Sequence, residues 1–145
     1  LPLDTKRTDI ELSPDILVQS EETPRSDRHH SILIAEDVYE NYFLLETLFG
    51  KQYQLYHALN GQEAIDMFET YHPDLILMDI KMPVMDGFEA TRRIRTLSKT
   101  IPIIALTAFA FEREKEIAKQ CEFTDYVVKP IDIKELKKLI AKVLA

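Results

Sequence analysis

The stretch Asp74-Leu75-Ile76-Leu77-Met78-Asp79 decides the fold. Its four inner residues are apolar without interruption, and an acidic residue stands at either end. A strand with one face in water alternates polar and apolar residues, whereas a strand covered on both faces is almost wholly apolar. The stretch therefore predicts a central strand of a parallel sheet that has helices on both of its faces.

Other short apolar runs, rich in β-branched residues, alternate with stretches of helical periodicity. The expected strands are residues 31–35, 53–58, 74–79, 102–106 and 124–128, and the expected helices are residues 38–50, 61–72, 87–97, 111–120 and 133–144. Strands that alternate with helices pair in parallel through right-handed crossovers. We expect an α/β fold with a doubly wound, five-stranded parallel sheet between two layers of helices.

Three of the expected helices carry a start signal. An Asn or Asp stands three residues before a Glu in the pairs Asn60/Glu63, Asp86/Glu89 and Asp132/Glu135. Such a pair can form a capping box, in which the two side chains bond amides that would otherwise lack partners.

The composition is that of one acidic globular domain. The chain has 145 residues, of which 46% are hydrophobic and 30% charged, and its formal net charge is −7. This balance argues against a nucleic-acid partner and against direct contact with an anionic membrane, and no apolar run is long enough to span a bilayer. Cys121 is the only cysteine, so an internal disulfide is excluded, and a reducing, cytoplasmic setting is expected.

Residues 1–30 differ in composition from the rest of the chain. They hold four basic and seven acidic residues, with no glycine and no aromatic residue. Such a segment buries too little apolar surface to offset the loss of chain entropy. We expect a linker over residues 1–30, with a short docked element within residues 9–18 as the alternative, and a folded domain over residues 31–145.

Chemically active side chains follow four of the five expected strands. Glu36-Asp37, Asp79, Thr107 and Lys129-Pro130 stand at those ends, whereas the second strand ends at His57-Ala58 without an obvious chemical group. The carboxyl ends of parallel strands meet at one edge, where ligands of such sheets bind. Crowded carboxylates need a compensating cation, and hard oxygen ligands suit Mg²⁺. With a lysine and a hydroxyl nearby, the edge is equipped for phosphoryl transfer to a carboxylate.

Four motifs in this order carry a resemblance to a known family. They are Ile32-Leu-Ile-Ala-Glu36-Asp37, the segment of residues 74–87 with Met82-Pro83 and Asp86-Gly87, Ile103-Ile-Ala-Leu-Thr107-Ala108, and Asp125-Tyr126-Val-Val-Lys129-Pro130. From Ser31 to Ala145 the sequence resembles the response-regulator receiver domain of two-component signalling, most like the C-terminal receiver of a hybrid histidine kinase. The resemblance implies a flavodoxin-like strand order, 2-1-3-4-5.

The resemblance also implies roles for the residues at the strand ends. Asp79 would accept a phosphoryl group from a phosphohistidine, with Lys129 and Thr107 as its catalytic partners. Mg²⁺, with Mn²⁺ as a possible substitute, would be held by Glu36, Asp37, Asp79 and the backbone carbonyl of Lys81. Thr107 and Tyr126 would form a switch pair, and the peptide bond to Pro130 would be cis.

The same resemblance implies a setting for the domain. The donor would be the dimerisation and phosphotransfer domain of a histidine kinase, in the same chain, and a histidine phosphotransfer protein is a further partner. Leu1-Pro2 would be the tail of the kinase's ATP-binding domain, and the parent kinase could be anchored in the inner membrane. The receiver itself would catalyse its own phosphorylation and lose the phosphoryl group slowly, with Phe109 and Lys81 at positions that tune its lifetime.

One departure and several competing interpretations stand beside this resemblance. The turn before the fifth strand carries Glu122 where the family usually has glycine, which predicts strain if that residue has a positive φ. A stand-alone single-domain response regulator is an alternative. A haloacid-dehalogenase-like phosphatase is disfavoured because Lys81 occupies the position of its second carboxylate, and a nucleotide-binding module is disfavoured because no glycine-rich phosphate loop is present.

Overall fold

The computed structural model describes residues 30–108 and 112–145. The linker expected over residues 1–30, His30 excepted, lies outside these residues, and so does Phe109. No helix within the described ranges is long and apolar enough to cross a membrane.

The strands form one parallel sheet. It contains β2 (Ser31–Ala35), β3 (Gln54–Ala58), β4 (Leu75–Asp79), β5 (Ile103–Thr107) and β6 (Asp125–Val128), in the order β3-β2-β4-β5-β6. Counted along the chain this is the order 2-1-3-4-5, so the predicted fold and topology are confirmed. Four strands begin one residue later than predicted, and Thr107 belongs to β5, an error of the size usual for element boundaries.

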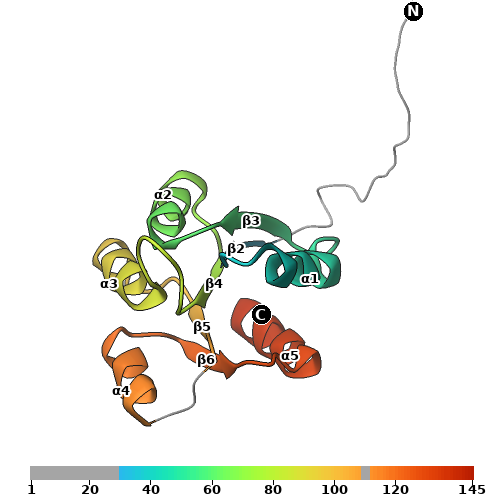
Figure 1. Ribbon diagram of the computed structural model, residues 1–145. Coiled ribbons are helices and arrows are strands. Elements are labelled where there is room, and N and C mark those ends of the chain that lie inside the picture. The colour runs from blue at the N-terminus through green and yellow to red at the C-terminus, as the bar shows by residue number, and fades with distance from the viewer. Residues whose placement is uncertain (1–29, 109–111) are drawn as a thin grey trace, which may run out of the picture.

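Helices cover both faces of the sheet. They are α1 (Tyr39–Phe49), α2 (Gly61–Tyr71), α3 (Gly87–Leu97), α4 (Glu112–Gln120) and α5 (Ile133–Leu144). Figure 1 shows α1 and α5 on one face and α2, α3 and α4 on the other. Along β4, Leu75 and Leu77 belong to the core under α1 and α5, whereas Ile76 and Met78 belong to the core under α2 and α3. All four side chains are fully buried, which explains the uninterrupted apolar run.

Of the two hydrogen bonds in each predicted capping box, the structure forms the one to the side chain of the cap residue. Asn60, Asp86 and Asp132 each accept a hydrogen bond from the backbone N–H of the glutamate three residues later. The glutamates do not complete the box: Glu63 accepts from Leu59 N, one residue before the cap, and Glu89 pairs with two arginines of its own helix.

Two backbone positions shape the loops around the sheet. Gly87 lies so close to β4 that a Cβ atom there would be 2.3 Å from the Asp79 carbonyl oxygen, so a side chain would displace the start of α3 from the end of that strand. In the turn before β6, Glu122 has a φ of 64°, so the condition under which strain was predicted is met. A side chain in this left-handed conformation is strained.

Candidate functional site

Three carboxylates meet at the carboxyl ends of β2 and β4. One oxygen from each of Glu36, Asp37 and Asp79 lies within 4.8 Å of the others. Glu36 and Asp37 follow β2 directly, and Asp79 ends β4, so the pairing of these two adjacent strands brings the groups together. Clustered carboxylate oxygens are the donor set that Mg²⁺ prefers, and the residues therefore fit this ion.

One amine reaches into the carboxylate cluster. Lys129 Nζ donates to Asp79 Oδ2 at 3.0 Å and to Glu36 Oε1 at 3.4 Å. Lys129 follows β6, its N–H donates to the Thr107 carbonyl at 2.7 Å, and its peptide bond to Pro130 is cis. A single positive charge is thus shared by two buried carboxylates, and a third carboxylate stands beside them.

Burial and neighbouring charges shift the pKa values of both Glu36 and Lys129. The pKa of Glu36 is raised above its ordinary value, first by burial and then by the charge of Asp79, and the bonds from Val38 N–H and Lys129 only reduce the shift. For Lys129, burial alone would lower the pKa, but the hydrogen bond and charge of Asp79 together with Glu36 raise it on balance. Burial and the charge of Asp79 thus outweigh the two groups that stabilise the ionised form of Glu36.

Lys81 lies next to the carboxylate of Asp79 through its backbone. Its N–H donates to Asp79 Oδ1 at 3.3 Å, and the residue is exposed. Asp79 thus accepts one bond at each carboxylate oxygen, from Lys81 and from Lys129. The Lys81 carbonyl as a metal ligand stays a prediction.

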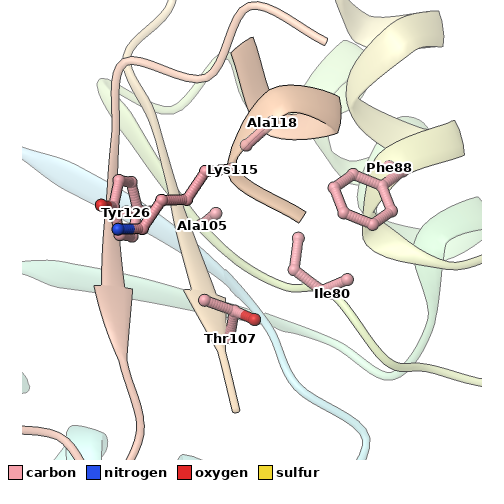
Figure 2. A pocket seen from close by; sticks show the side chains of 7 residues that line it. All are labelled: Ile80, Phe88, Ala105, Thr107, Lys115, Ala118 and Tyr126. Atoms are coloured by element: carbon pink, nitrogen blue, oxygen red, sulfur yellow. The ribbon is translucent and has the colours of Figure 1, made fainter. Parts of the chain in front are cut away.

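Thr107 and Tyr126 lie on the neighbouring strands β5 and β6, below α4. Thr107 is buried, whereas Tyr126 is 38% exposed. Figure 2 shows both beside a small cavity that Lys115 also lines, and its volume of about 10 Å³ holds no more than one water. Lys115 Nζ lies 5.9 Å from the centre of the Tyr126 ring. Tyr126 therefore lines this small cavity together with Thr107 and remains partly exposed.

The family follows from a comparison with known sequence families. The model of the family described as "Response regulator receiver domain" matches residues 32–141, most of the chain. The chain belongs to this family. It is a receiver domain of two-component signalling, a class of domain that works with histidine kinases and phosphotransfer partners.

Individual relatives agree with the family. The receiver is 34% identical over 117 residues to Sporulation initiation phosphotransferase F of Bacillus subtilis, covering 80% of this chain and 94% of that protein. It is 38% identical over 114 residues to Regulatory protein AtoC of Escherichia coli, covering 78% of this chain but only 25% of AtoC. A solved receiver domain of a sensor histidine kinase from Pseudomonas aeruginosa, with a magnesium ion coordinated in its active site cleft, has a TM-score of 0.74 and 34% identity, covering 79% and 97% of the two chains.

The receiver also has a residue at this site that the sequence did not point out. His57 stands near the end of β3, the strand set aside for lack of a chemical group. Its Nε2 lies 2.8 Å from the backbone oxygen of Glu36, and its ring stacks on Tyr42 with 3.7 Å between ring centres. The only signal in the sequence was a histidine at a strand end, which any exposed strand end can carry.

Proposed function

We propose that this receiver accepts a phosphoryl group from a phosphohistidine onto Asp79. The observation that carries the proposal is the placement of Asp79: its carboxylate lies at the carboxyl end of a central strand, 3.0 Å from Lys129 Nζ and within the cluster formed with Glu36 and Asp37. Such an edge is where ligands of open α/β sheets bind.

The transfer step uses the groups around Asp79. A carboxylate oxygen of Asp79 attacks the phosphorus, the new O–P bond forms as the P–N bond to the histidine breaks, and the electron pair goes to the imidazole nitrogen, which takes a proton from water. Lys129 pairs with one phosphoryl oxygen and the Thr107 hydroxyl donates to another. The receiver thereby catalyses its own phosphorylation and then loses the phosphoryl group slowly by hydrolysis.

Glu36, Asp37 and Asp79, with the Lys81 carbonyl, would hold Mg²⁺. When bound there, Mg²⁺ would supply positive charge against the negative charge of the carboxylates and the phosphoryl group. Mn²⁺ is a possible substitute because it shares the preference for oxygen ligands. The oxygen donor set supports this assignment, and so does the magnesium ion in the similar receiver from Pseudomonas aeruginosa.

The response to phosphorylation would be a paired movement of Thr107 and Tyr126. The Thr107 hydroxyl moves toward the new anion, and the Tyr126 ring moves inward into the space beside it. The present cavity of about 10 Å³ is far too small for a phenol ring, so α4, which contributes Lys115 and Ala118 to its lining, has to shift as well. The phosphoryl group would in this way change the surface formed by α4 and β6.

The domain would form the C-terminal receiver of a hybrid histidine kinase in the cytoplasm, with residues 1–30 as linker and residues 31–145 as receiver. The parent chain would be a membrane-anchored or soluble histidine kinase whose dimerisation and phosphotransfer domain is the donor. A histidine phosphotransfer protein would be a further recipient of the group. The similar receiver of a sensor histidine kinase supports this setting. A stand-alone regulator is the competing arrangement, because Sporulation initiation phosphotransferase F is matched over 94% of its length. The coding sequence before Leu1 distinguishes them: a hybrid kinase requires an ATP-binding domain there.

The phosphoacceptor assignment is tested with acetyl phosphate. We expect intact mass and peptide mapping to show one phosphoryl group on Asp79 in the presence of Mg²⁺, and none after chelation. Asp79→Asn should abolish labelling with an unchanged circular dichroism spectrum, whereas Asp66→Asn, at an exposed site on α2, should label like the wild type. Full labelling of Asp79→Asn would overturn the assignment.

A further inference from the structure

We propose that His57 is a positioning residue for the acidic site. Its ring fixes the backbone carbonyl of Glu36 and thereby sets the direction in which Asp37 leaves the end of β2. The inference rests on the proposed function, since it assigns His57 to the Mg²⁺ site of the phosphoacceptor, and the experiment below separates the two.

Glu36 lies just beyond the last residue of β2, where the sheet no longer orders the main chain. Its N–H still donates to the Ala58 carbonyl at 3.0 Å. Its carbonyl oxygen accepts a hydrogen bond from His57 Nε2 at 2.8 Å, and because a carbonyl can only accept, this ring nitrogen carries the proton. Both main-chain groups of Glu36 are therefore bound to the end of β3.

The His57 ring is itself held in place. It is parallel to the Tyr42 ring, with an interplanar angle of 0° and 3.7 Å between the centres. Tyr42 is a buried residue of α1, and Tyr39, one turn earlier on the same helix, is stacked at 6.4 Å from the histidine. A donor fixed by stacking can orient the carbonyl that it bonds.

The His57 hydrogen bond affects the acidic site through the planar peptide unit that joins Glu36 to Asp37. The Glu36 carbonyl and the Asp37 N–H belong to the same peptide plane, so the orientation of the carbonyl limits where the Asp37 side chain can point. The Glu36 side chain has its own anchors, because Val38 N–H donates to Oε2 at 3.1 Å and Lys129 lies at Oε1. The histidine therefore acts mainly on Asp37, the most exposed carboxylate of the three.

Two substitutions separate this role from simple packing. His57→Phe keeps a ring that can stack on Tyr42 but removes the donor. His57→Gln loses the ring but keeps an N–H donor at nearly the same distance from the backbone. His72, which follows α2 and contacts only the edge of the Phe68 ring among the described aromatic residues, provides a matched control.

The measurement is calorimetric titration of the whole chain with Mg²⁺, together with the urea midpoint of unfolding for each variant. We expect His57→Phe to weaken Mg²⁺ binding about tenfold, the lower end of the range for residues that orient metal ligands. Its urea midpoint should fall only by the loss of one hydrogen bond to the Glu36 carbonyl. His57→Gln should bind Mg²⁺ within about twofold of wild type while its midpoint falls, because the stacking is lost. His72→Gln should change neither the binding nor the midpoint.

Wild-type Mg²⁺ affinity in His57→Phe would overturn the positioning role and leave the proposed function intact. A loss of affinity that tracks the loss of stability in both variants would also overturn it, because it would make His57 a packing residue. If the wild-type chain binds no Mg²⁺ at all, the proposed function fails together with the inference.

Discussion

Arg95 and Lys129 are both largely buried cations, but their hydrogen-bond acceptors differ: those of Arg95 are neutral and those of Lys129 are charged. Arg95 is 6% exposed and, among the described residues, donates to main-chain carbonyls: to Ile101 at 2.7 Å, Glu122 at 2.9 Å and Ser98 at 3.3 Å. Lys129 lies between two carboxylates at the opposite end of the strands. The first arrangement pairs a cation with neutral acceptors, and the second places the Lys129 amine in a cluster of three carboxylates.

The difference indicates that Arg95 stabilises the fold, whereas Lys129 belongs to a ligand-binding site. Arg95 ties the turn after α3 to the turn after α4, and every acceptor that it contacts is neutral. At the acidic edge, burial and the neighbouring Asp79 raise the pKa of Glu36 even though Lys129 is present. Charges that repel one another in the absence of a ligand are typical of functional sites.

The largest loss of stability is expected from Arg95→Met. The substitution keeps the apolar stem but leaves three carbonyls without their donor, which should lower the free energy of unfolding by about 3 kcal/mol. Urea denaturation measures the change, and Mg²⁺ affinity should stay as in the wild type. Arg93→Met is the control: Arg93 is 56% exposed and paired only with Glu89 in its described ion pairs, so a change within about 0.5 kcal/mol is expected. Equal effects of the two substitutions would contradict the structural role assigned to Arg95.

A smaller loss is expected from Lys129→Met at pH 7 without divalent cations. Two carboxylates then lack their shared amine, and about 2 kcal/mol should be lost, less than for a fully buried pair because Lys129 is 25% exposed. The loss should shrink as the pH falls through the raised pKa of Glu36, because a protonated carboxyl no longer needs the amine. Urea denaturation at pH 4 and at pH 7 measures this; a loss that grows on acidification would contradict it.

The smallest effect is a gain, expected from Glu122→Gly. Glu122 supplies a carbonyl to Arg95 while its φ is 64°, a conformation that glycine adopts without strain. Relief of this strain should exceed the entropic cost of glycine and raise the unfolding free energy by about 0.5 kcal/mol. Glu122→Ala removes the same carboxylate but keeps the strain, so thermal unfolding should show no gain for it. Equal midpoints for the two variants would contradict the account.

The sequence predicts those features of the fold and site that depend on residues close together in the chain. Apolar runs such as residues 74–79 predict the strands, because a strand covered on both faces buries consecutive residues. An Asp or Asn before a helix predicts its N-cap, because the side chain bonds an amide only three residues away. Parallel strand order then brings Glu36, Asp37 and Asp79 to one edge without further information. Glu122 was singled out because the resembled family usually has glycine at this turn, but its positive φ is known only from the structure.

The parts that could not be predicted depend on contacts between distant segments. Arg95 lies on a helix with Arg92 and Arg93, and nothing local distinguishes the buried arginine from the two exposed ones. His57 reads as a polar strand end, and its role requires the Glu36 carbonyl, 21 residues away in sequence, and the Tyr42 ring. Both roles arise from tertiary packing, which the pattern of single residues does not contain.

The most direct test of the account is the unfolding free energy of wild type and Glu36→Gln at pH 7, with and without Mg²⁺. Burial and the charge of Asp79 raise the pKa of Glu36 on folding, so the contribution of this group to stability is greatest below pH 4.5 and declines as the pH rises toward the folded pKa. We predict that Glu36→Gln is more stable than wild type by about 1 kcal/mol without Mg²⁺, and that saturating Mg²⁺ removes or reverses the difference. A less stable Glu36→Gln in the absence of Mg²⁺ would contradict the account.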